Sequence, residues 1–401
     1  MKLALSMLCE NPERKTGLTS LYHAFVERSL AHYDDVEWII YLGESQEWTA
    51  TGARVELVRK FPANDKTVAR IFADHFRVAG DAANRGADCL VTTGFVPTIR
   101  TLPVAMHMLS LQHLNTDNQV GLARRLYRKV SAESGLDRAE LIITNTEFAI
   151  SQILSVNPGC KDRIIQSYEG MDHDDFHAKI TKAEVARLKE ECDIDPGYLL
   201  WTSNFYPYKQ AELLIDAYAG LTKKLRKQMP LVMVGGGGWG DGLESTKARI
   251  AEHGLEDDVK FLGWVADDII APLYRNAHVF ALASAEETFG RCVLESMACG
   301  TPCIVNDIPV MHEVTAEHAV ITDFHDTKAT TKGLRDLAED EALRTKLIRD
   351  GKKRSKDFSF DILACQRIDA IRAMLEAQRS ERSGDGNSHS HDEESAPVVA
   401  V

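Results

Sequence analysis

Short runs of apolar residues, each about the length of a β-strand, recur along this 401-residue chain between longer amphipathic segments. In the first half, the runs predict strands at 3–7, 38–42, 89–93, 108–112 and 141–144. Buried strands that alternate with helices are typical of α/β domains. The pattern therefore predicts a largely parallel sheet with helices on its faces.

The alternation is interrupted around residues 168–194, where a polar stretch and a charged helix at 182–192 occur. A second series of apolar runs then predicts strands at 198–203, 231–234, 259–262, 279–283 and 302–305. We therefore expect two doubly wound, Rossmann-like α/β domains, at 1–178 and 179–359. Open α/β sheets bind ligands beyond the carboxyl ends of their strands, so a ligand is expected in the cleft between the two domains.

The C-terminal end of the chain contains one more apolar-periodic segment. It predicts a helix at 360–378, which we expect to return to the N-terminal domain. Residues 379–401 are polar and contain few large hydrophobic side chains. Such a segment has too little apolar surface to offset its ordering entropy, so a disordered tail is expected there.

Composition narrows the classes of function. The net charge of -13 is spread along the chain without a basic block, which argues against a nucleic-acid surface. The eight cysteines form no CxxC pair, so reduced thiols are expected rather than a disulfide framework or a structural metal site. The apolar run at the N-terminus is too short for a signal peptide, and no stretch approaches the roughly 20 apolar residues of a spanning helix. A cytoplasmic location is expected.

One segment, at 284–302, combines acidic residues with a predicted helix start. The helix is expected to begin near Gly290 or Arg291 and to end at Gly300. Its free N–H groups and positive dipole end favour an anionic diphosphate. Glu287 lies in the loop before the helix, and Glu295, one turn in, can accept hydrogen bonds from paired hydroxyls such as those of a ribose. Taken alone, two glutamates at this place also fit capping and solvated charge.

The whole segment resembles the Glu-x7-Glu motif of the retaining glycosyltransferases of family 4, the glycosyl transferases group 1. The usual form is E-G-F-G-x-x-x-x-E-A-M-A-x-G-x-P, and the matching positions here are Glu287, Phe289, Gly290, Glu295, Met297, Ala298, Gly300 and Pro302. Thr288 stands where glycine is commoner. The resemblance spans about residues 1–375 and implies the GT-B fold of two facing Rossmann-like domains.

Further positions resemble the family's donor-binding loops. Lys209 matches the lysine of the G-R-x-x-x-x-K loop, whose two cations contact the donor diphosphate, but Asn204 stands where arginine is usual and carries no charge. Gly236 and Gly237 belong to a V-G-x-G loop beside the nucleotide, and Val265 to an F-x-G-x-V stretch that lines the base pocket. Simple tight turns remain an alternative for both.

The same glycines also satisfy the G-x-G-x-x-G pattern of dinucleotide-binding domains. The pattern is weak here because its strand is internal to the domain and Asp257 and Asp258 precede the next strand instead of ending it.

The N-terminal half resembles the family at fewer positions. Gly17 matches a glycine-rich loop near the donor phosphates, and His113 matches the strand-ending T-x-H whose histidine contacts the donor sugar. Residues 168–172 resemble the N-G-V-D sequence at the domain junction. Four cations are grouped on one predicted helix, where relatives contact anionic lipid, although a solvated face is equally consistent. These cations are Arg124, Arg125, Arg128 and Lys129.

The resemblance implies transfer of a hexosyl unit, with retention, from a GDP- or UDP-sugar to a hydroxyl of a glycan, lipid-linked or small-molecule acceptor. The resemblance also implies that the reaction needs no metal and no cofactor other than the donor substrate. It further implies a role in polysaccharide biosynthesis. Glu287, Lys209 and His113 are expected to act in catalysis, with the remaining motif residues and Arg291 binding the donor. A sugar-nucleotide epimerase of the same fold, a non-catalytic binding subunit and a dehydrogenase remain alternatives.

Overall fold

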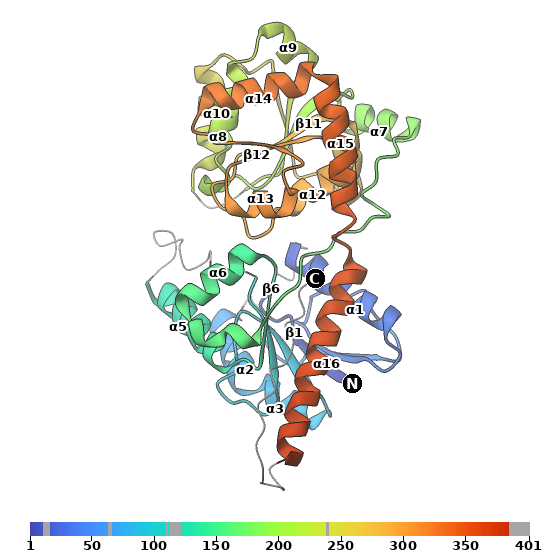
Figure 1. Ribbon diagram of the computed structural model, residues 1–401, viewed down its shortest axis with the longest axis vertical. Coiled ribbons are helices and arrows are strands. Elements are labelled where there is room, and N and C mark those ends of the chain that lie inside the picture. Colours follow the sequence, from blue (N-terminus) through green and yellow to red (C-terminus); the bar gives the residue numbers. More distant parts are fainter. Residues whose placement is uncertain (11–16, 63–65, 110, 112–121, 238–239, 385–401) are drawn as a thin grey trace, which may run out of the picture.

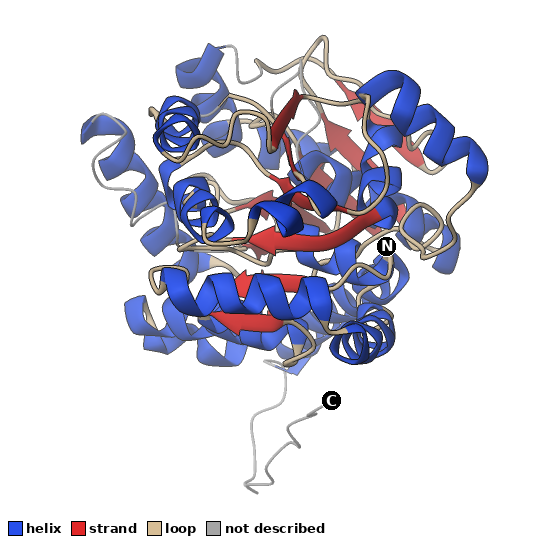
Figure 2. Ribbon diagram, turned by 90° about the horizontal axis from the view of Figure 1, so that it is seen from above, coloured by secondary structure: helices blue, strands red, loops and turns tan. Residues whose placement is uncertain are grey.

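A computed structural model of the chain describes all residues except 11–16, 63–65, 110, 112–121, 238–239 and 385–401. The described elements form two α/β domains that lie one above the other along the long axis of the molecule (Figure 1). Seen from above, strands run between layers of helices (Figure 2). The expected fold class, two facing Rossmann-like domains, is confirmed.

The N-terminal sheet contains seven described strands in the order β3-β2-β1-β4-β5-β6-β7, all parallel. The strands are β1 (Lys2–Ser6), β2 (Glu37–Tyr41), β3 (Val55–Val58), β4 (Cys89–Thr93), β5 (Val104–His107), β6 (Leu141–Thr144) and β7 (Ile164–Gln166). The α-helices described around them are α1 (Gly17–His32), α2 (Thr67–Phe76), α3 (Val78–Asn84), α5 (Leu122–Arg138) and α6 (Glu147–Val156).

The C-terminal sheet contains six described strands in the order β10-β9-β8-β11-β12-β13, again parallel. These are β8 (Tyr198–Thr202), β9 (Leu231–Val234), β10 (Val259–Gly263), β11 (Ala277–Leu282), β12 (Cys303–Asn306) and β13 (Val320–Thr322). The helices are α7 (Lys182–Cys192), α8 (Ala211–Ala219), α9 (Lys223–Gln228), α10 (Gly242–Glu252), α11 (Asp267–Asn276), α12 (Arg291–Ala298), α13 (Pro309–Thr315), α14 (Thr327–Glu339) and α15 (Glu341–Ser355).

Most strands lie within a residue or two of the expected runs, but the expected strand at 108–112 is wrong. The strand is β5, Val104–His107, which pairs with β4 through Leu90 and Val104. All four of its residues are buried, and the strand lies between β4 and β6 in the sheet. The apolar run simply begins earlier than expected, directly after Pro103.

The last helix, α16 (Phe360–Gly384), leaves the C-terminal domain and packs along α1 (Figure 1). Leu363, Ile368 and Ile371 are buried in the same hydrophobic cluster as Phe25 of α1. The helix extends past the expected start of the tail, so the expectation of disorder is wrong for 379–384. An ion pair of Arg379 with Asp88 holds this last part against the N-terminal domain, and 385–401 lie outside the described residues.

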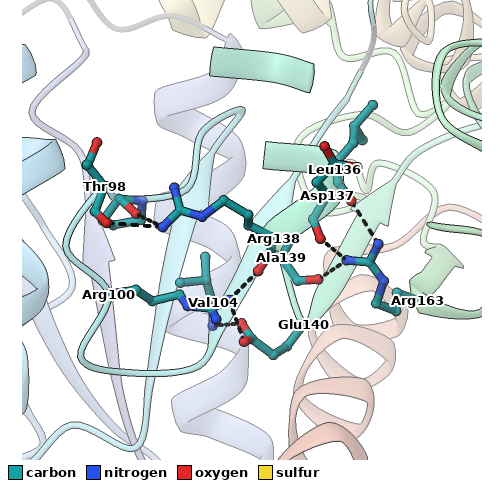
Figure 3. A network of polar contacts seen from close by, with 10 residues as sticks. Thr98, Arg100, Val104, Leu136, Asp137, Arg138, Ala139, Glu140 and Arg163 are labelled. Carbon is teal, nitrogen blue, oxygen red and sulfur yellow. Dashed lines mark hydrogen bonds and ion pairs between the residues drawn. The ribbon is translucent and has the colours of Figure 1, made fainter. Parts of the chain in front are cut away.

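A polar network fixes the segment that leads into β5 (Figure 3). The Arg138 guanidinium at the end of α5 donates to the Thr98 carbonyl at 3.1 Å. Glu140 accepts from Arg100 at 2.7 Å and from the Val104 backbone N–H at 2.8 Å. These contacts fix the end of α5 against the segment before β5. They thereby help to position the side chains at the carboxyl end of the sheet.

In the part of the chain that the structure describes, no helix is both long and apolar enough to cross a membrane.

Candidate functional site

Lys209 and Glu287, which are 78 residues apart in the sequence, form an ion pair in the C-terminal domain. The Lys209 Nζ lies 2.6 Å from the Glu287 Oε1, and both side chains are largely buried. Lys209 closes a short 3₁₀ turn after β8, and Glu287 lies in the loop after β11. The two loops are joined directly because the Ala285 N–H donates to the Tyr208 carbonyl at 2.8 Å.

Lys209 and Glu287 stabilise each other's charged forms. Burial lowers the pKa of Lys209, but the charge and hydrogen bond of Glu287, together with Tyr208 and Cys292, outweigh burial, so the net pKa of Lys209 is raised. The ammonium therefore stays charged at neutral pH. Removing either partner alone would leave a buried charge without compensation.

The helix start is where the sequence predicted it. Gly290 has φ +86° and is followed by α12, which begins at Arg291. The left-handed φ favours glycine at this position, and a Cβ atom there would lie 2.5 Å from the Met311 Cε, so the flexible end of that side chain would have to shift. Phe289 beside it is fully buried, with its ring 6.0 Å from that of Tyr168. The first N–H groups of α12 are thus held in a fixed direction.

Arg291 connects the two domains. Its Nη1 donates to the Gly17 carbonyl at the start of α1 at 3.0 Å, and its Nη2 lies 3.5 Å from the Glu295 Oε1. Burial raises the pKa of Glu295, while Arg291 and a hydrogen bond with Tyr274 oppose that shift. Gly17, Arg291 and Glu295 line a cleft of about 860 Å³ between the domains.

The remaining C-terminal residues that the sequence predicts to bind the donor lie in three adjoining loops, after β8, β9 and β10. The Phe205 N–H, next to Asn204, donates to the Gly237 carbonyl at 3.1 Å. A Cβ atom on Gly236 would lie 3.0 Å from the Trp264 indole ring, next to Val265. The structure therefore gathers these loops at the carboxyl ends of β8, β9 and β10.

Thr288 belongs to the same loop as Glu287 and is partly exposed.

Within the described residues, no three His, Cys, Asp or Glu side chains are grouped as a metal site requires.

His113 lies outside the described residues, and the strand-ending histidine is His107. Its imidazole is buried, its Nδ1 lies 2.7 Å from the Tyr22 hydroxyl, and its Nε2 has no hydrogen-bond partner among the described residues. Burial lowers the pKa of His107 well below its ordinary value, so the ring is neutral. Placing the strand end correctly would have selected this histidine from the sequence.

Arg367 of α16 is a second residue that the sequence motifs missed. It is fully buried, donates from Nε to the Ser167 Oγ at 3.2 Å, and leaves both terminal nitrogens without partners among the described residues. Burial lowers its pKa to about 10. Nearby, Glu169 accepts from the Asn145 amide at 3.0 Å. No local motif marks an arginine that reaches the N-terminal sheet from the last helix.

The four cations of the basic helix all lie on α5. The side chains of Arg124 and Arg125 are outside the described set, while Lys129 lies 3.9 Å from Glu133 in an exposed pair. Arg128 lines a separate cavity in the N-terminal domain.

Comparison with known proteins gives a family match over residues 172–354, to the family described as glycosyl transferases group 1. O-antigen chain mannosyltransferase B of Escherichia coli is 27% identical over 250 residues, which cover 62% of this chain and 64% of that protein. D-inositol 3-phosphate glycosyltransferase of Saccharomonospora viridis is 26% identical over 261 residues, 63% of this chain and 60% of that protein. The chain thus spans less than two thirds of both relatives.

Solved structures match nearly the whole chain. Sucrose-phosphate synthase from Thermosynechococcus elongatus has a TM-score of 0.76 at 18% identity, covering 94% of this chain and 99% of its own. WaaG, a glycosyltransferase involved in lipopolysaccharide biosynthesis, has a TM-score of 0.71 at 16% identity, covering 92% and 99%. Anabaena HepE in complex with UDP and glucose has a TM-score of 0.68 at 17% identity, covering 92% and 99%. These similarities establish the GT-B fold.

Proposed function

We propose that this chain transfers a hexosyl unit from a nucleoside diphosphate sugar to a hydroxyl acceptor, and the match of residues 172–354 to the glycosyl transferases group 1 family supports this proposal. The donor is a GDP- or UDP-sugar, and the acceptor is a glycan, a lipid-linked or a small-molecule hydroxyl compound. The observation that carries the proposal is the Lys209–Glu287 pair, 2.6 Å apart, in the loops that also hold the start of α12.

In this reaction the bond between the anomeric carbon and the diphosphate breaks, and negative charge develops on the leaving diphosphate. Lys209, Arg291 and the first N–H groups of α12 stabilise that charge without the need for a metal ion. Glu287 accepts hydrogen bonds from the donor sugar, and Glu295 accepts from the ribose. Asn204 donates an amide hydrogen bond without charge.

The acceptor hydroxyl attacks as the diphosphate leaves, its proton passes to the departing diphosphate oxygen, and retention places the new bond on the face that the diphosphate occupied. His107 replaces His113 as the candidate for contact with the donor sugar, because it is the histidine at the end of β5. Two similar proteins support the substrate class: one relative is a mannosyltransferase, and HepE was solved with UDP and glucose.

We also propose that the protein is cytoplasmic and rests on an anionic membrane surface. Of the ten large hydrophobic side chains left exposed in the described part, six lie on α2, α5 and the loop between β4 and β5: Val68, Phe72, Phe76, Ile99, Leu126 and Val130. Arg77 covers the Phe72 ring at 5.5 Å, and α5 carries Arg124, Arg125, Arg128 and Lys129. An exposed apolar face with cationic residues on the same helices suits an anionic bilayer.

Sedimentation with vesicles tests the membrane contact. Anionic vesicles should co-sediment the protein and neutral ones should not, and Phe72→Ser with Phe76→Ser should abolish the difference. Ile362→Ser, at an exposed apolar position on α16, serves as the control. Equal sedimentation of the double variant and the wild type would refute the contact.

A panel of GDP- and UDP-sugars, incubated with and without acceptors, tests the activity. Free nucleoside diphosphate that appears only with an acceptor supports transfer and excludes an epimerase. Donor binding without turnover across a broad acceptor panel would indicate a binding subunit, and binding of a nicotinamide cofactor would indicate a dehydrogenase. The anomeric configuration of the product, read by NMR, tests retention, and activity in the presence of EDTA tests independence from metal.

A further inference from the structure

The last helix brings one positive charge into the interior of the N-terminal domain. Arg367 of α16 is fully buried where this helix lies along α1 (Figure 1). Its guanidinium carbon lies 5.7 Å from the centre of the Phe25 ring on α1. A buried cation costs free energy unless polar groups around it respond to its charge, so its neighbours indicate what it does.

No carboxylate forms a hydrogen bond with Arg367 in the part of the chain that the structure describes. Its Nε donates to the Ser167 Oγ at 3.2 Å, and its Nη1 and Nη2 have no partner among those residues. Glu169 interacts with Arg367 electrostatically, but its carboxylate accepts from the Asn145 amide at 3.0 Å. The charge of Arg367 is therefore not neutralised by a direct ion pair, and it acts on the polar groups nearby.

Tyr22 of α1 is one of the groups on which this charge acts. Burial raises the pKa of Tyr22, and the positive charge of Arg367 is the largest effect that opposes the rise. The Tyr22 hydroxyl lies 2.7 Å from the His107 Nδ1 and has no other hydrogen-bond partner among the described residues. A hydroxyl dipole turns its oxygen towards a cation and its hydrogen away from it. Tyr22 therefore donates to His107 and does not accept from it.

This direction of the hydrogen bond fixes the tautomer of His107. Burial, with a smaller contribution from Arg367, lowers the pKa of His107 well below its ordinary value, so the neutral ring carries one N–H group. An Nδ1 that accepts from Tyr22 leaves that hydrogen on Nε2. The Nε2 has no hydrogen-bond partner among the described residues, so it is a donor whose capacity is unused.

We infer that Arg367 is a positioning residue for glycosyl transfer: by orienting the Tyr22 hydroxyl, it holds His107 in the tautomer whose Nε2–H donates to an oxygen of the donor sugar. This role rests on the proposed function, in which His107 contacts that sugar. The last helix thus takes part in donor recognition, although no local motif marks it.

Nitrogen NMR of the whole protein, with isotope-labelled histidine rings, reads the tautomer. His107 should show an unprotonated Nδ1 and a protonated Nε2, and its signals are identified by their absence from His107→Gln. Arg367→Met should give both tautomers, because the charge that orients Tyr22 is lost, whereas Arg367→Lys keeps the charge and should retain the wild-type signals. A protonated Nδ1 in the wild type, or an unchanged tautomer in Arg367→Met, would overturn the inference.

Turnover and nucleotide binding separate this role from a purely structural one. Arg367→Met and Tyr22→Phe should each lower kcat about threefold to tenfold, as the loss of one hydrogen bond does, while the affinity for free UDP or GDP, measured by calorimetry, stays unchanged. Arg372→Met is the matched control on the same helix, because Arg372 pairs with Asp35 and covers the Tyr33 ring at 5.4 Å. This control should leave both kcat and the tautomer unchanged.

The remaining outcomes distinguish the role of Arg367 from the reaction itself. Equal kcat in Arg367→Met and the wild type, or a loss of nucleotide affinity that parallels the loss of kcat, would overturn the inference and leave glycosyl transfer standing. Absence of transfer by the wild type from every nucleotide sugar would overturn both. If Arg367→Met does not fold, Tyr22→Phe takes its place, and an unchanged kcat or tautomer in that variant overturns the inference.

Discussion

Lys209 and Glu287 show how a single pair of side chains can serve both the fold and the reaction. Each neutralises the other while the donor is absent, and each is expected to turn to the donor when it binds. Stability and turnover should therefore respond differently to the loss of one charge or of both.

Lys209→Met should reduce turnover by about 10²–10³-fold, as loss of a group that stabilises transition-state charge does, and should also lower the free energy of unfolding because Glu287 is left buried. Adding Glu287→Gln should restore stability but not turnover. Urea unfolding and donor turnover, measured on both variants, check this. Recovery of turnover in the double variant would contradict the assigned roles.

The buried carboxyl group of Glu295 is expected to make the stability of the protein depend on pH. Its folded-state pKa is raised, first by burial, so the folded protein binds this proton more tightly than the unfolded chain does. Stability is therefore lost as the pH rises through the folded pKa. Glu295→Gln should raise the melting temperature at pH 7, and the gain should vanish below about pH 4, where the carboxyl is protonated in both states. A gain that is equal at both pH values would contradict the shift.

Among individual residues, local sequence predicted Lys209 and Glu287, which the structure pairs, because each lies in a continuous loop with a recognisable motif. His107 was missed because the strand end was misplaced by several residues. Arg367 could not be found, because its significance depends on packing between distant segments.

At the scale of elements, α12 depends on one backbone conformation at its start. Gly290→Ala should destabilise the protein by about 1–3 kcal/mol for the left-handed φ, with a further cost for the contact with Met311, and should weaken donor binding. Gly254→Ala is the matched control, since Gly254 has φ +62° and nothing lies near its Cβ position. Equal losses in both variants would show that the Met311 contact has no effect.

Strands with continuous apolar runs were predictable, since burial on both faces of a parallel sheet leaves a clear signal. The edge strands β3, β7 and β13 were not expected at all. Their residues are mostly only partly buried, so polar positions interrupt the pattern. The start of α12, expected near Gly290 or Arg291, is at Arg291, and it was predictable because a glycine and the following motif mark it.

At the scale of the whole molecule, Glu313 of α13 joins the domains. Its carboxylate accepts from the Glu147 N–H at 2.8 Å, from the Phe148 N–H at 3.3 Å and from the Gln166 amide at 2.7 Å. The first two donors are at the N-terminus of α6, where a negative charge is favoured by about 0.3–1 kcal/mol or more.

Glu313→Ala should shift the molecule towards a more open arrangement of its domains, because these interdomain hydrogen bonds are lost. Small-angle X-ray scattering should show a larger radius of gyration for this variant. Glu317→Ala, which removes only an exposed partner of His312, should leave the radius unchanged. An unchanged radius in Glu313→Ala would show that other contacts hold the domains together.

The return of α16 to the N-terminal domain affects how the chain is made. The first domain is synthesised long before residues 363–371, yet its core includes their side chains. During translation, α1 therefore has an uncovered apolar face until residues 363–371 have left the ribosome. The nascent first domain has to remain incomplete, and in need of protection from aggregation, while the second domain is already folding.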